Sequence, residues 1–184
     1  MCKILKKLQR KSAQQILEEN NISLSPPIDL YLLLKRLHIS VLGEDFSDIE
    51  YTVGYEHGEI LGAAISKEDL LTIFYRINDS ENRKRFTIAH ELGHCALHTE
   101  NLKAEHVELR KNSNSEDYKE KAANIFAGEL LIPENTLRDI YGRLLNPSLS
   151  TLAQIFKVST SVMEMRLEHL SIPYFKDVFC QNIF

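Results

Sequence analysis

The spacing of hydrophobic positions changes along the chain, and the changes predict an order of helices and strands. Apolar residues three and four positions apart predict helices over residues 3–20 and 29–37. The spacing then falls to two, or becomes continuous, over residues 39–77, where β-branched and aromatic side chains are frequent. This segment predicts a small, mostly antiparallel sheet that includes a hairpin with its turn at His57-Gly58.

The helical spacing returns after this sheet. Asp79 or Ser80 can cap a helix that runs to about His98, and residues 99–114 predict a loop. The later apolar spacing predicts four more helices. The first is opened by a capping box at Ser113 and Glu116 and is interrupted at Pro133, and the second covers residues 134–144. The last two are short and lie around a turn within residues 148–170. The order of elements therefore predicts an α+β fold.

Composition and charge narrow the class of protein. The net charge of −4 and the pI of about 6.0 argue against a strongly basic nucleic-acid binder. The basic start of the chain predicts the solvated face of a helix, with a docking patch for an acidic partner as the alternative. We expect neither a membrane span nor a secretory signal, because no apolar stretch is long enough or suitably placed. Three cysteines at long spacings indicate a reducing cytoplasm.

The sequence RFTIAHELGHCALH, residues 85–98, contains the chemistry-bearing motif HExxH. Residues four apart in a helix lie about 40° and 6 Å apart, so His90 and His94 can converge on one cation. Glu91 points elsewhere around the helix, where it can act as a general base on a water molecule. A zinc ion at this site would lower the pKa of that water to about 7 and polarise a peptide carbonyl. The motif therefore predicts peptide hydrolysis.

Two neighbours of the motif refine the prediction. Gly93 costs about 1 kcal/mol relative to alanine in mid-helix, which suggests that another element packs closely there. His98 would lie about 12 Å along the axis from His90, too far to share one ion, so we expect it either to support the ligands without binding the ion or to end the helix. The third ligand must then come from another element. Four acids of the next helix are candidates that spacing alone does not separate: those at positions 116, 117, 120 and 129.

RFTIAHELGH, followed by EKAANIFAGELLIP, resembles the ImmA/IrrE family of bacterial metallopeptidases. The likeness extends to PPIDLYLLLKRLHISV and to LAQIFKVSTSVMEMRL, and so covers most of residues 12–170. It implies that residues 1–146 form a minimal zincin-like core, which contains the small sheet and the active-site helices. Residues 147–184 would form a helix-turn-helix-like subdomain and tail packed on that core.

The resemblance also implies roles for individual residues. His90, His94 and Glu120 look like ligands of Zn²⁺, and Glu91 looks like the catalytic base. Asn124, one helical turn after Glu120, is a candidate partner that orients a ligand histidine. Many family members have a second acid where this chain has an alanine at position 122, and its absence here favours Glu120 as the ligand.

The family's activity is the site-specific cleavage of a helix-turn-helix repressor, which releases transcription. The resemblance implies a cytoplasmic zinc endopeptidase of the short branch found with mobile genetic elements, acting on such a repressor or an antitoxin-like regulator. The alternative is a non-catalytic regulator, either a pseudo-protease or a DNA-binding module that uses residues 148–170. DNA binding is disfavoured because the second helix of that segment contains Glu164 and Glu168 and is not positively charged.

Two features concern how a substrate would be held. Residues 61–65, LGAAI, have small side chains and predict an edge strand to which an extended substrate could add by backbone pairing. An oxyanion stabiliser could come from any of five tyrosines, which the sequence does not rank: those at positions 51, 55, 75, 118 and 141.

Overall fold

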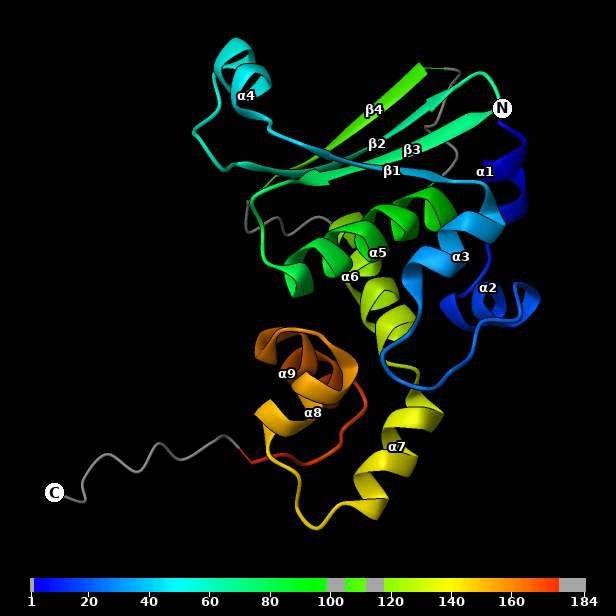
Figure 1. Ribbon diagram of the computed structural model, residues 1–184, viewed down its shortest axis with the longest axis vertical. Coiled ribbons are helices and arrows are strands. Elements are labelled where there is room, and N and C mark those ends of the chain that lie inside the picture. The colour runs from blue at the N-terminus through cyan, green and yellow to red at the C-terminus, as the bar shows by residue number, and fades with distance from the viewer. Residues whose placement is uncertain (1, 99–104, 112–117, 176–184) are drawn as a thin grey trace, which may run out of the picture.

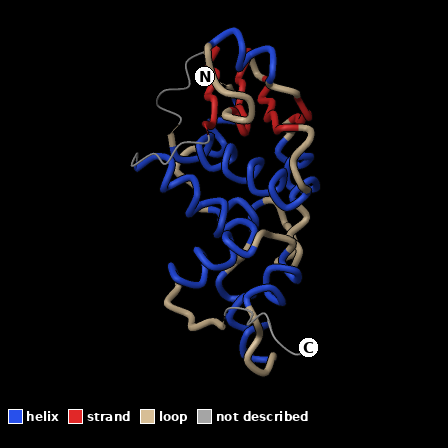
Figure 2. Tube along the Cα trace, turned by 90° about the vertical axis from the view of Figure 1, so that its left-hand side faces the viewer, coloured by secondary structure: helices blue, strands red, loops and turns tan. Residues whose placement is uncertain are grey.

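The computed structural model describes residues 2–98, 105–111 and 118–175, with backbone alone for 105–111. One sheet lies at one end of the molecule, and layers of helices extend from one of its faces (Figures 1 and 2). The strands are β1 (Ser40–Glu44), β2 (Ile60–Lys67), β3 (Leu70–Arg76) and β4 (Glu105–Lys111). The helices are α1 (Lys3–Leu8), α2 (Ala13–Glu19), α3 (Leu30–Leu37), α4 (Ser47–Val53), α5 (Glu81–Leu97), α6 (Tyr118–Leu131), α7 (Glu134–Arg143), α8 (Leu149–Phe156) and α9 (Thr160–His169).

The sheet is mostly antiparallel, as predicted. Its strand order is β1-β3-β2-β4, and only the β1–β3 pair is parallel. The fold is α+β with a small zincin-like core, which confirms the predicted class. The division of the chain at residue 146 stays a prediction.

The predicted loop over residues 99–114 is wrong in part, because residues 105–111 form β4. This strand pairs with β2 on the side opposite β3, so β2 lies inside the sheet. The prediction that residues 61–65 form an edge strand for a substrate is therefore wrong. The capping box predicted at Ser113 and Glu116 lies outside the described residues.

The hairpin predicted with its turn at His57-Gly58 is also wrong. The segment before that turn forms α4, and the antiparallel hairpin is the one between β2 and β3. The cause is a buried acid in α4. Glu50 accepts hydrogen bonds from the backbone N–H groups of Gly58, at 3.0 Å, and Ile60, at 2.7 Å, and pairs with the Arg76 guanidinium. These partners hold α4 against the start of β2.

The first predicted helix, over residues 3–20, is two helices. The chain turns at Arg10, whose φ is 62°, and Ser12 begins α2 with a capping box completed by Gln15. The backbone N–H of Arg10 donates to the carbonyl of Ala96 in α5, at 2.9 Å. The break thus lets α1 lie against α5, a tertiary contact that the apolar spacing does not reveal.

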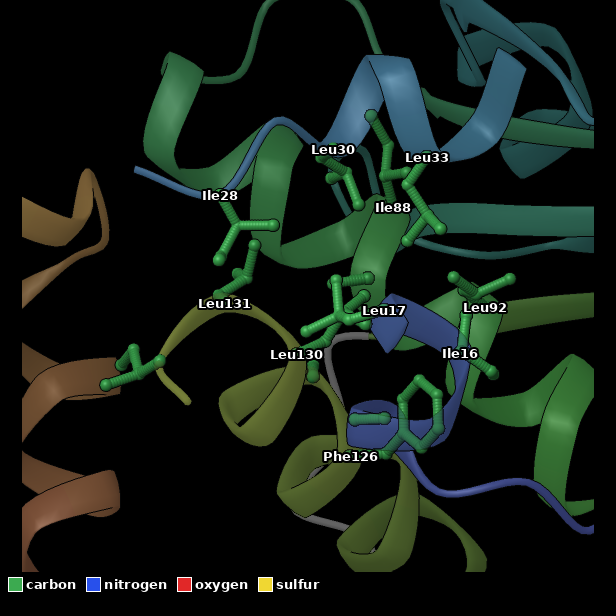
Figure 3. Packing of buried hydrophobic residues seen from close by; sticks show 14 of the residues in the cluster. Ile16, Leu17, Ile28, Leu30, Leu33, Ile88, Leu92, Phe126, Leu130 and Leu131 are labelled. Carbon is green, nitrogen blue, oxygen red and sulfur yellow. The ribbon is translucent and has the colours of Figure 1, made fainter. Parts of the chain in front are cut away.

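The core lies between the sheet and the helices. α5 packs against β2 and β3 on one side and against α6 on the other. Figure 3 shows Ile88 and Leu92 of α5 among side chains of the N-terminal helices and α6. Because both sides of α5 are covered, eleven of its seventeen residues are buried, and polar side chains of this helix must find partners inside the protein.

α8 and α9 form the predicted pair of short helices, joined at Lys157 with a left-handed φ of 50°. Two arginines attach this pair to the rest. Arg85 of α5 donates to the carbonyl of Lys157, at 3.3 Å, and Arg166 of α9 donates to that of Ile132, at 3.1 Å. None of the helices in the described part of the chain is both long and apolar enough to cross a membrane.

Candidate metal centre

α5 places two imidazoles on one face in the middle of the protein. The helix begins after Ser80, whose hydroxyl accepts from the Arg83 backbone N–H, and runs unbroken through the motif. His90 and His94 are both buried, and their Nε2 atoms lie 2.9 Å apart. The predicted convergence of residues four apart is confirmed.

Glu120 of α6 completes a group of three donors. Its Oε2 lies 3.3 Å from His90 Nε2 and its Oε1 lies 3.1 Å from His94 Nε2. Among the described residues, these three side chains form the group that could hold a metal ion, with donor atoms within 4.8 Å of one another. Of the other candidate acids, Glu129 pairs instead with Arg166, and those at positions 116 and 117 lie outside the described residues.

The donor set fits zinc. Two imidazole nitrogens and one carboxylate are a ligand set of catalytic zinc sites in peptidases. Donors bound tetrahedrally at about 2.1 Å lie about 3.4 Å apart, close to the separations of 2.9 to 3.3 Å between these atoms. Hydrogen bonds from His90 and His94 hold the pKa of the Glu120 carboxyl well below its usual range. The carboxylate is therefore charged at neutral pH, as a metal ligand must be.

Asn124 contacts the first histidine from behind. Its Oδ1 lies 2.8 Å from His90 Nδ1, so Nδ1 carries the hydrogen and donates it. Because Asn124 holds the hydrogen on Nδ1, loss of the Nε2 hydrogen on metal binding would leave the lone pair of the neutral ring on Nε2, the atom that faces Glu120. The structure thus brings Asn124 to the place that the resemblance implied.

Gly93 explains how α6 comes close enough. A β-carbon added to Gly93 would lie 3.0 Å from Phe126 Cδ1 and 3.3 Å from the α-carbon of Ala123. The two helices therefore touch at backbone distance between the positions of Glu120 and Asn124. This confirms that another element packs closely at Gly93.

Glu91 lies apart from the three donors and is buried on the side of α5 that faces the sheet. A β-carbon added to Gly62 of β2 would lie 3.2 Å from Glu91 Oε1 and 2.5 Å from Thr87 Cγ2. The missing side chain at Gly62 makes room for both groups. The small residues of β2 can be seen in the sequence, but this contact cannot, because the crossing of β2 over α5 is set by tertiary packing.

The remaining candidates are His98 and the five tyrosines. His98 ends α5 and is not one of the three donors, as expected. The Tyr118 ring meets the His98 ring edge-on with centroids 6.2 Å apart, and the Tyr118 side chain is largely exposed. Tyr51 is exposed on α4, and Tyr141 donates to the carbonyl of Pro173. An oxyanion role for any of the five tyrosines stays a prediction.

A family model described as the IrrE N-terminal-like domain, Peptidase_M78, matches residues 38–168. The match covers more than half of the chain and includes His90, Glu91, His94 and Glu120. Searches of the curated proteins and of the solved structures found no match.

Proposed function

The chain belongs to the peptidase family of the IrrE N-terminal-like domain, and from this premise we propose that it is a zinc-dependent, site-specific endopeptidase. Its proposed substrate is a helix-turn-helix repressor or an antitoxin-like regulator, whose cleavage would relieve transcriptional repression in the cytoplasm. The observation that carries the proposal is the convergence of His90, His94 and Glu120, with Glu91 next to His90 on the same turn of α5.

Each side chain has a defined task in this proposal. His90 Nε2, His94 Nε2 and one oxygen of Glu120 would hold the ion. When bound, zinc supplies a Lewis acid that polarises a carbonyl and lowers the pKa of water. Glu91 accepts the proton of the attacking water and delivers it to the amine that leaves. The absence of a side chain at Gly62 of β2 leaves space for the Glu91 carboxylate, since an added β-carbon would lie 3.2 Å from its Oε1.

Low exposure of the site supports a restricted substrate. The His90 and His94 side chains are 0% and 1% exposed, and Glu120 is 29% exposed. A site so enclosed suits one partner that binds a large surface better than it suits arbitrary peptides. This enclosure, together with the resemblance described above, favours a regulatory peptidase over a digestive one.

The DNA-binding alternative is disfavoured by the second helix of the pair. The Tyr174 hydroxyl lies 2.7 Å from Glu164 Oε1 and 3.0 Å from Glu168 Oε1 of α9, so the two carboxylates share its one hydrogen. Tyr174 therefore occupies the turn of α9 that offers two carboxylates, where phosphate contacts would need Lys or Arg. A pseudo-protease that binds the repressor without cutting it is the remaining alternative, and an intact Glu91 disfavours it.

The test combines metal analysis with a cleavage assay. Purified protein would be incubated with the repressor encoded next to its own gene, and the products identified by mass spectrometry. We expect about one zinc per chain and a single cut. Glu91→Gln should keep the zinc and cut about 10²- to 10⁴-fold more slowly. Glu120→Gln should lose the zinc and the cleavage together.

Two outcomes would overturn the proposal. Equal cutting by wild type and Glu91→Gln would show that the assigned base is wrong. A wild-type protein that takes up no divalent cation would reject the metal site itself. Binding of the repressor without a cut in any variant would favour the pseudo-protease.

A further inference from the structure

A row of three imidazoles runs along α5 and ends against the beginning of α6. The His90 and His94 ring centroids lie 4.6 Å apart, and those of His94 and His98 lie 5.5 Å apart. The backbone N–H of His98 donates to the carbonyl of His94, at 2.9 Å, which closes the last turn of the helix. This backbone hydrogen bond fixes the position of the His98 backbone relative to His94.

The other end of the His98 ring contacts α6. His98 Nε2 lies 3.3 Å from the backbone carbonyl of Lys119. A carbonyl oxygen can only accept, so Nε2 carries the hydrogen and is the donor. Lys119 directly precedes Glu120, and the Tyr118 ring packs edge-on against the same imidazole. The first turn of α6 is therefore held by one side chain of α5.

This contact is one of two that flank Glu120. The His98–Lys119 bond lies on the N-terminal side of Glu120, and the His90–Asn124 bond lies one turn beyond it. β4, an edge strand of the sheet, lies between α5 and α6 in the chain. Because α6 does not follow α5 directly, the covalent connection alone does not fix the position of the first turn of α6. Loss of the His98 bond would leave that turn held from one side.

We infer that His98 is a positioning residue, which donates from Nε2 to the Lys119 carbonyl and so holds the Glu120 carboxylate between the His90 and His94 nitrogens. The inference rests on the proposed metal site. It adds to the three donors a residue that fixes the first turn of α6, which contributes the third donor, Glu120. His98 acts through Glu120 and does not touch the ion. Its bond to Lys119 occupies Nε2, one of the two ring nitrogens through which a histidine can bind a metal.

Two substitutions separate this role from others. His98→Ala removes the donor. His98→Gln places an amide N–H₂ close to the position of Nε2 and can restore the bond to Lys119. His169→Ala removes an exposed histidine at the end of α9 and serves as the matched control. Affinity for Zn²⁺ would be measured by competition with a chromophoric chelator, and the Co²⁺-loaded proteins would be compared by visible absorption.

We expect His98→Ala to weaken zinc binding by about 10- to 100-fold, the usual effect of losing a residue that orients a ligand. His98→Gln should recover most of the affinity, and His169→Ala should match wild type. At saturating Co²⁺, all variants should show the wild-type spectrum, because the ligands are unchanged.

Three results would overturn the inference. Wild-type zinc affinity in His98→Ala, even with a lower melting temperature, would assign His98 a purely structural role. Equal weakening in the Ala and Gln variants would exclude the hydrogen bond to Lys119. A changed Co²⁺ spectrum at saturation would make His98 a ligand. Failure of the wild-type protein itself to bind zinc would instead reject the proposed function.

Discussion

Asn124 Oδ1 lies 2.8 Å from His90 Nδ1, and this pair joins the two helices that supply the three donors. The amide oxygen accepts the Nδ1 hydrogen and leaves Nε2 free to act as a ligand atom. One contact thus links α6 to α5 and fixes the tautomer of His90. α6 contributes both a donor, Glu120, and the residue that prepares another donor on α5.

Replacement of this asparagine should weaken metal binding. We expect Asn124→Ala to lower zinc affinity by about 10- to 100-fold, because the His90 ring loses the acceptor that fixes its orientation. Asn124→Asp should keep most of the affinity, since a carboxylate accepts the same hydrogen. Chelator competition measures both, with Asn135→Ala on the exposed start of α7 as control. Equal affinities for the Ala variant and wild type would contradict the orienting role.

Two glycines on helices should respond in opposite ways to alanine. Gly93→Ala inserts a β-carbon 3.0 Å from Phe126 and 3.3 Å from Ala123, and we expect it to lower the free energy of unfolding by about 1–3 kcal/mol. Gly142→Ala on α7 meets nothing within 4 Å and should raise that free energy by about 0.4–1 kcal/mol. Urea denaturation gives both values. A stabilised Gly93→Ala protein would mean that α5 and α6 are not in backbone contact there.

Gly62→Ala should impair cleavage while leaving the metal in place. The new β-carbon would lie 2.5 Å from Thr87 Cγ2 and 3.2 Å from Glu91 Oε1, so both side chains must move. A displacement of about 1 Å at a catalytic group can cost on the order of 10²-fold in rate. Adding Thr87→Ser removes Cγ2 and should recover part of the loss. Unchanged turnover in Gly62→Ala, with zinc content confirmed, would rule out this control of Glu91.

The Glu50–Arg76 pair should make stability depend on pH. Burial alone would raise the pKa of Glu50, but the N–H groups of Ile60 and Gly58 and the Arg76 charge outweigh it and hold the pKa below its usual value. A lowered carboxyl pKa adds stability above the unfolded-state pKa of about 4.3, and this is lost as pH falls through the folded-state value.

Glu50→Gln should therefore lower the free energy of unfolding by up to about 3–5 kcal/mol at pH 7, because the buried Arg76 loses its buried carboxylate partner and keeps only the largely exposed Asp45, 3.9 Å away. The difference from wild type should begin to shrink below the unfolded-state pKa of about 4.3 and continue to shrink as pH falls through the lower pKa of the folded wild-type carboxyl. Urea denaturation from pH 3 to 7 measures this, and the exposed Glu56→Gln is the matched control. A difference that does not change with pH would exclude the charge as its cause.

The parts of the molecule predicted from sequence are those that local chemistry determines. Four-residue spacing on a helix places His90 and His94 together whatever surrounds them, and Ser80 caps α5 through its own neighbours. The spacing of residues does not separate Glu120 from the three other candidate acids, and only the family resemblance selects it. The packing of α6 at Gly93, which is a tertiary contact, decides which acid reaches α5.

The errors arose where distant residues decide local structure. Residues 47–53 form a helix because Glu50 forms an ion pair with Arg76, which lies 26 positions away in β3. Residues 105–111 form β4 by pairing with the edge of β2 that β3 does not use. The sequence of residues 105–111 alone does not indicate this pairing. The break at Arg10 depends on the Ala96 carbonyl. In each case, the partner that stabilises the observed structure lies far along the chain.

Arg85 and Arg166 join the helical pair α8–α9 to α5 and to the end of α6 through neutral carbonyl acceptors. A guanidinium stays charged throughout the cellular range of acidity, even where burial lowers its pKa, and a carbonyl does not titrate there at all. These two hydrogen bonds therefore keep their donors and acceptors across the cellular range of pH. The ion pair of Arg166 with Glu129, at 3.7 Å, adds a charged contact beside the second bond, so the attachment of α9 combines a bond that protons leave unchanged with one that depends on a carboxylate.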